Sequence, residues 1–90
     1  MRPGDFQIEV NLGRAFLEMP GRLDDAIAQF EAALRQRPNS AAVHLDLAVA
    51  LLQVPGRSGE AVPHLEEALR LQPSLERARR LLDLVRKSSR

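Results

Sequence analysis

The chain has 90 residues and a formal net charge of +1, and its composition is 44% hydrophobic and 28% charged. This length supports one small domain, and the absence of cysteine excludes a disulfide framework and a thiolate zinc site. The longest apolar run, residues 47–52, is far shorter than the roughly 18 residues of a membrane span. The N-terminus lacks the apolar core of a signal peptide, which indicates a cytoplasmic protein if Met1 is the native start.

Apolar residues at helical spacing predict helices over residues 5–18, 24–36, 40–53, 59–71 and 75–87. The first and third are apolar almost all round, as expected of helices covered on more than one side. The second and fourth each carry one apolar stripe, which includes Phe30 in the former and Leu65 in the latter. The fifth has apolar residues on one face and charges elsewhere, so we expect one face to pack against the other helices and the opposite face to meet water, as in a terminal capping helix.

An internal repeat relates the first four helices. Residues 6–40 and 41–75 share 12 identical positions, among them two Pro-Gly-Arg triplets at residues 20–22 and 55–57. Proline ends the preceding helix and glycine accepts positive φ, so each triplet predicts a type II turn that doubles the chain back. We expect Asp24 or Asp25, and Ser58, to accept hydrogen bonds from the first amides of the helices that follow.

The stack needs close helix contacts. Small residues, above all Gly13 and its equivalent Ala48, permit this approach. We expect the core between the helices to be filled by larger side chains, namely Leu12, Phe16, Phe30, Leu47, Leu51 and Leu65.

The sequence resembles the tetratricopeptide repeat family, whose pattern runs Trp-x2-Leu-Gly-x2-Tyr, then Ala, an aromatic residue and Pro. "NLGRAF" (11–16), "DDAIAQFEAAL" (24–34) and Pro38 match closely, and "DLAVAL" (46–51), "EAVPHLEEAL" (60–69) and Pro73 match more loosely. The family tryptophan is replaced by Glu9, His44 and Arg79. The resemblance implies an all-α, right-handed α-solenoid: a single domain over residues 1–90, with repeats at about 6–40 and 41–74 and a capping helix at about 75–88.

The resemblance also implies a scaffold that binds a peptide or helix of a partner protein in a concave groove lined by the first helix of each repeat. The partner-binding residues expected on this basis are Val10, Arg14, Leu17, Leu45, Val49, Leu52, Arg77, Leu81 and Leu84. The alternative for some of them is burial beneath neighbouring helices.

One family subtype holds a terminal carboxylate with a clamp of Lys, Asn, Asn, Lys and Arg. The corresponding residues here are Val10, Arg14, Asp46, Arg77 and Leu81. Only the two arginines are cationic, and Asp46 repels a carboxylate. The sequence therefore favours an apolar or amphipathic helix as the ligand, bound through anchors at i, i+3, i+4 and i+7.

Chemistry-bearing residues are too few for an enzyme. His44 and His64 are the only histidines; we expect each to be structural or solvent-facing, with His64 on the outer side of its helix. No spacing resembles a zinc, calcium or phosphate motif, so we expect no catalytic residue, metal or cofactor.

Cations are concentrated near the C-terminus, at Arg77, Arg79, Arg80, Arg86, Lys87 and Arg90. Nucleic-acid binding through this cluster is a lesser alternative to protein binding, because Trp and Tyr are absent and every Phe precedes the cluster. A helix C-terminus also favours cations without any ligand.

The repeat period extends to the N-terminus, where Pro3 lies 35 residues before Pro38 and 70 before Pro73. Pro3 thus occupies the place where an earlier repeat would end, and we expect the chain to be a segment of a longer array. The first helix would then expose a face that a preceding helix covers in that array. Self-association, as a homodimer through this face, is the second hypothesis for the function.

Overall fold

The computed structural model describes residues 5–88, and all regular structure in this range is helical. The five helices are α1 (Asp5–Leu17), α2 (Leu23–Gln36), α3 (Ala41–Leu52), α4 (Ser58–Leu71) and α5 (Glu76–Ser88). Every boundary lies within one residue of its predicted position. Pro3 and Arg90, which entered the sequence argument, lie outside the described residues.

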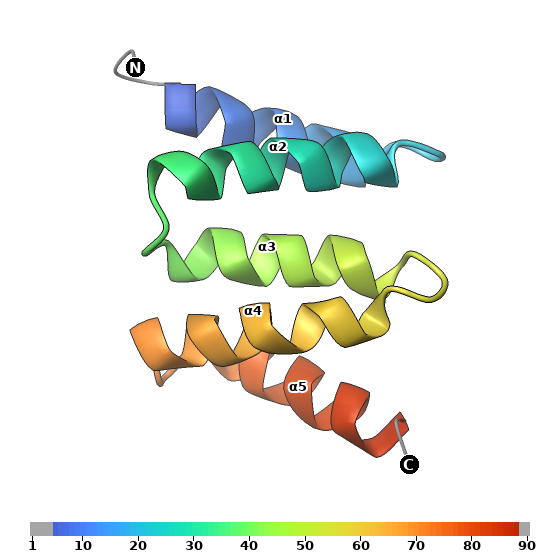
Figure 1. Ribbon diagram of the computed structural model, residues 1–90, viewed down its shortest axis with the longest axis vertical. Coiled ribbons are helices and arrows are strands. Elements are labelled where there is room, and N and C mark those ends of the chain that lie inside the picture. Colours follow the sequence, from blue (N-terminus) through green and yellow to red (C-terminus); the bar gives the residue numbers. More distant parts are fainter. Residues whose placement is uncertain (1–4, 89–90) are drawn as a thin grey trace.

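The helices pack in chain order, each against the next (Figure 1). α1 and α2 form one antiparallel pair, α3 and α4 form a second, and α5 closes the far end of the stack. The fold is thus the all-α repeat stack that the sequence predicts. Within residues 5–88, no helix combines the length and the apolar character needed to cross a bilayer.

Both Pro-Gly turns have the predicted geometry. Gly21 and Gly56 have φ of 76° and 83°, the left-handed region that glycine tolerates. The Arg22 amide donates to the Met19 carbonyl at 3.3 Å, and the Arg57 amide donates to the Val54 carbonyl at 3.1 Å. Each triplet therefore forms a hydrogen-bonded type II turn, which brings the next helix back alongside the last one.

The predicted caps of α2 and α4 are wrong. The residues that precede these helices are Arg22 and Arg57, and neither makes a side-chain capping bond. Each arginine instead pairs with the carboxylate three residues on: Arg22 with Asp25, and Arg57 with Glu60 at 2.8 Å. Ser58 is already the first residue of α4, too late to cap it.

The core is closest packed where α1 meets α2. Phe30 is fully buried, and a Cβ added to Gly13 would lie 2.5 Å from its Cε1 atom. Only glycine fits here without a shift of the ring. The second repeat has Ala48 and Leu65 at the equivalent positions, both fully buried. Ala48 has a methyl group that Gly13 lacks, and Leu65 is smaller than Phe30, which leaves room for it.

Leu12 is not a core residue, contrary to the prediction. Its side chain is 42% exposed, whereas its repeat equivalent Leu47 is 1% exposed. The difference follows from position in the stack, because α3 packs between α2 and α4 while α1 is the first helix described. The same residue type is thus core in one repeat and surface in the other.

Candidate functional site: a groove along α1, α3 and α5

The nine residues predicted to contact a partner separate into three groups by exposure. Arg14, Arg77 and Leu84 are exposed, and Val10 and Leu45 are buried, with 3% and 7% of their surface accessible. The other four are half-buried: Leu17, Val49, Leu52 and Leu81.

Val10 and Leu45 are therefore part of the core. Val10 precedes Gly13 by one helical turn and lies on the same side of α1, the side that meets Phe30 of α2. Leu45 and Ala48 repeat this relationship in α3. A partner has no access to either side chain while the helices stay packed.

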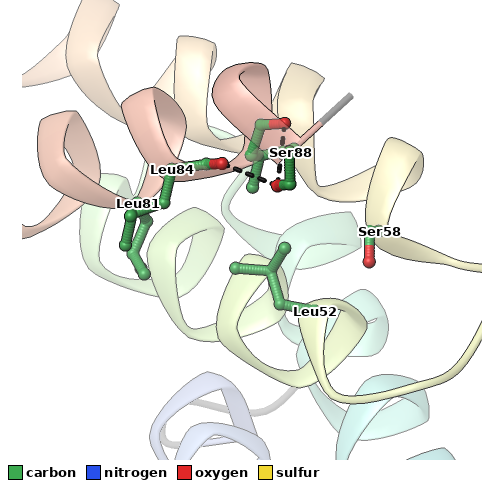
Figure 2. Close-up of a pocket in the computed structure, with 6 residues that line it drawn as sticks. Leu52, Ser58, Leu81, Leu84 and Ser88 are labelled. Atoms are coloured by element: carbon green, nitrogen blue, oxygen red, sulfur yellow. Dashed lines mark hydrogen bonds between the residues drawn. The ribbon is translucent and has the colours of Figure 1, made fainter. Parts of the chain in front are cut away.

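Three of the predicted residues meet at one cavity. Leu52 at the end of α3 and Leu81 and Leu84 of α5 line a space of about 400 Å³. Figure 2 shows Leu52 directed from α3 toward the space below α5, with Leu81 and Leu84 on one side and Ser88 above. The Ser88 hydroxyl donates to the Leu84 carbonyl at 2.7 Å, and Ser58 also lines the cavity, so leucine side chains and polar groups share its lining.

A charged cluster lies on the same set of helices, near the middle of α3. Arg14 of α1 pairs with Asp46 of α3, with Nη2 2.9 Å from Oδ2. Burial raises the pKa of the Asp46 carboxyl, and the hydrogen bond and charge of Arg14, with the charge of Arg77, oppose that rise. Arg14 is thus already neutralised by Asp46, which disfavours a carboxylate clamp.

Asp46 and Leu52 are separated by about 9 Å along α3, because they are six residues apart and the helix rises 1.5 Å per residue. The predicted partner-binding residues therefore place leucines at the C-terminal end of α3 and an ion pair near the middle of this helix.

A histidine pair, which the sequence analysis missed, lies between α3 and α4. His44 is 8% exposed, and its Nε2 atom lies 2.8 Å from the Pro38 carbonyl oxygen. Its Nδ1 atom lies 3.0 Å from Nδ1 of His64. A carbonyl only accepts, so Nε2 of His44 carries a proton, and in neutral His44 Nδ1 then accepts from His64.

The prediction that His64 lies on the outer side of α4 is therefore wrong. His64 is half-buried against His44. Burial, followed by the proximity of His44, lowers the pKa of His64. The alignment of the two repeats could not predict this pair, because the first repeat has Glu9 and Gln29 at the equivalent positions. The pair joins α3, α4 and the α2–α3 linker, and so it is structural.

Among residues 5–88 there is no group of three or more His, Asp or Glu side chains placed to hold a metal ion. Comparison with known families identifies the class of protein. A model of the tetratricopeptide repeat family matches residues 10–76. The chain belongs to this family. Comparison with curated proteins and with solved structures found no match.

Tetratricopeptide repeats generally mediate protein–protein interaction and are typically non-catalytic scaffolds. The matched range spans most of α1 through the start of α5, and so it includes both Pro-Gly turns and the Arg14–Asp46 pair. It ends at Glu76, so most of α5, with Leu81 and Leu84, lies beyond it. The cavity therefore combines a residue inside the family match, Leu52, with residues outside it.

Proposed function

We propose that this protein is an interaction module that binds an amphipathic helix or apolar peptide of a partner protein in the groove along α1, α3 and α5. The observation that carries the proposal is the exposure of Leu84, 62% accessible at the edge of a cavity of about 400 Å³ that Leu52 and Leu81 also line. A large apolar side chain in that position gains free energy when a ligand covers it.

The expected ligand places one apolar side chain in the cavity and extends toward the charged middle of the groove. Burial of one such side chain is worth up to roughly 1.5–3 kcal/mol, so the leucines can supply a large part of the affinity of a peptide. Arg77 is exposed on the first turns of α5, where it suits an acidic or polar group of the ligand. Arg14 contributes less, since Asp46 already holds it.

The test is selection of binders from a displayed library of helical peptides, followed by measurement of their affinity for variants of the protein. Leu84→Asp should weaken a groove-bound peptide by about ten-fold or more, the loss expected from one unburied apolar anchor. Ile8→Asp, at an equally exposed apolar residue of α1 (59%) away from the cavity, identifies peptides that bind the exposed face of α1 instead. A library from which every binder tolerates Leu84→Asp would contradict the proposal.

Nucleic-acid binding through α5 stays the lesser alternative. Arg77, Arg79, Arg80, Arg86 and Lys87 are all exposed, but Arg79 donates to the Pro73 carbonyl and Arg86 pairs with Glu66. Binding to a single-stranded oligonucleotide that falls steeply with salt would favour this alternative over the groove.

A further inference from the structure

The basic side chains of residues 5–88 divide into those with a partner and those without one. Arg79 donates to the Pro73 carbonyl at 3.1 Å, and the Arg37 guanidinium lies 4.6 Å from the centre of the Phe6 ring. Carboxylates pair with five more, namely Arg14, Arg22, Arg57, Arg70 and Arg86. Within this part of the chain, no ion pair, hydrogen bond or ring contact involves the other four, which are Arg35, Arg77, Arg80 and Lys87. Three of these four cations lie on α5.

The three unpaired cations of α5 border its exposed leucine. Residues three and four apart are neighbours on a helix surface. Arg80 precedes Leu84 by four residues and Lys87 follows it by three, so a cation lies on each side of Leu84 along the helix. Arg77 lies a further turn before, next to Arg80. These four residues, hereafter the α5 ridge, combine a 62% exposed apolar side chain with cations that have no ion-pair partner in residues 5–88.

Acidic residues of α5 leave this charge uncompensated. Glu76 lies four residues before Arg80, a spacing that suits an ion pair. Asp83 has the same relation to Lys87, yet neither carboxylate forms an ion pair within residues 5–88. Five basic and two acidic residues give α5 a net charge of +3.

The helix dipole accounts for only part of this charge. Lys87 is in the last turn of α5, where the negative end of the dipole favours a cation. Arg77 is the second residue of α5, where the positive end of the dipole disfavours one. The charge of Arg77 acts on the Asp46 carboxyl of α3, but Asp46 forms its ion pair with Arg14, at 2.9 Å. Arg77 therefore keeps the capacity to pair with an anion from outside the chain.

The spacing of the α5 ridge describes the ligand that complements it. A rise of 1.5 Å per residue places Arg80 about 6 Å and Lys87 about 4.5 Å from Leu84 along the axis, on opposite sides of it. A ligand helix alongside α5 matches this order when one apolar residue has Asp or Glu three or four positions before it and after it. Leu84 lies beside Leu81 at the cavity that Leu52 lines from α3, so the apolar residue that covers Leu84 also reaches the cavity (Figure 2).

We propose that the ligand of the groove is an acidic amphipathic helix of a partner protein, in which an apolar anchor at Leu84 is flanked by carboxylates that pair with the cations of the α5 ridge. This inference rests on the proposed function, and it adds the sign and the spacing of the charges that the ligand carries. A nucleic acid also supplies negative charge. However, it offers no aliphatic side chain to cover Leu84, and residues 76–88 include no aromatic side chain on which its bases could stack.

The probes are peptides from the helical library that bind the parent protein and lose affinity for Leu84→Asp. Each is made with a fluorescein label in three forms, with Glu, Gln or Lys at the positions three and four residues before and after its apolar anchor. In fluorescence anisotropy at low ionic strength, the Glu form should bind about ten-fold more tightly than the Gln form, and the Lys form most weakly. These differences should shrink as salt is added.

Charge reversal in the protein should reverse the preference. The double variant Arg80→Glu/Lys87→Glu should bind the Lys form more tightly than the Glu form. Arg35→Glu is the matched control, because Arg35 is also exposed and unpaired but lies on α2, away from the cavity. This variant should keep the preference of the parent protein. Circular dichroism of each variant checks that the helices remain folded.

Two results would overturn the inference while the proposed function stands. One is equal affinity of the Glu and Gln forms for the parent protein, and the other is a preference that Arg80→Glu/Lys87→Glu leaves unchanged. A single-stranded oligonucleotide that binds more tightly than the Glu form, and whose binding Leu84→Asp leaves intact, would assign the α5 ridge to nucleic acid instead. If no selected peptide depends on Leu84, the proposed function itself fails, and this inference fails with it.

Discussion

Replacement of Gly13 by alanine tests the close contact between α1 and α2. The added methyl group would lie 2.5, 2.8 and 2.9 Å from three ring atoms of Phe30, about 1 Å inside ordinary carbon–carbon contact. Phe30 is fully buried, so its ring has little room to move away. We expect Gly13→Ala to destabilise the protein although alanine is the better helix former.

The magnitude follows from two opposed terms. Overpacking of a core costs about 1–3 kcal/mol, and alanine gains about 1 kcal/mol over glycine inside a helix. The net loss is about 0–2 kcal/mol, and a loss of about 1 kcal/mol lowers the Tm of a domain of this size by roughly 4–8 °C.

The second repeat supplies the compensating substitution. Because Ala48 stands with Leu65 where Gly13 stands with Phe30, the double variant Gly13→Ala/Phe30→Leu should recover stability. Phe30→Leu alone should cost roughly 1–2 kcal/mol, less than full truncation to alanine. Urea unfolding of the four proteins gives the coupling energy, which we expect to be about 1 kcal/mol or more in favour of the double variant. Additive effects of the two substitutions would refute the contact.

Three further predictions concern the turns, the core and pH. Gly56→Ala should destabilise the protein by about 1–2 kcal/mol, because a φ of 83° is strained for alanine. Gly59→Ala, in the first turn of α4 with open space around it, should be neutral or stabilise by up to about 1 kcal/mol. Thermal melts of both variants test this contrast. Leu47→Ala should cost about 2–5 kcal/mol in urea unfolding, and the contrasting Leu84→Asp should stay within about 0.5 kcal/mol. The pKa of His64 in the folded protein is lowered from 6.5, so the unfolded chain takes up this proton first as the pH falls. Neutral His64 therefore contributes fully to the free energy of unfolding above about pH 6.5, and this contribution is lost as the pH falls below that value. Urea midpoints at about pH 7.5 and about pH 5.5 should therefore differ less in His64→Gln than in the parent protein, and an unchanged difference would contradict the assignment.

Local chemistry explains why the helix boundaries were predictable. Proline and glycine at residues 20–21 and 55–56 leave the backbone few conformations other than a turn, and the same turn occurs in both repeats. The periodic apolar residues of α2 and α4 likewise determine which face of each helix is buried. Fold class and helix limits therefore follow from short-range patterns that one sequence contains.

The exposure of single residues was less predictable, because it depends on neighbours in the stack. Leu12 and Leu47 are identical residues at equivalent positions, yet among the helices of residues 5–88 only Leu47 has one on its outer face. Val10 and Leu45 were expected in the groove and lie in the core, since a shift of one position around a nearly all-apolar helix exchanges the two environments. The groove itself stays a prediction, supported by the cavity beside Leu84.

The histidine pair could not be inferred at all. His44 and His64 are 20 residues apart, on separate helices, and the first repeat has Glu9 and Gln29, not histidine, at the equivalent positions. Their contact arises only when the α3–α4 turn sets the register of the two helices.

The Arg14–Asp46 pair has a consequence for the curvature of the stack. It joins α1 directly to α3, across the position of the intervening α2. A link on one side only restrains how far the two helical pairs can splay apart there. Because Arg14 is about half exposed, dissolved ions screen this restraint, and the stack should bend more freely as ionic strength rises.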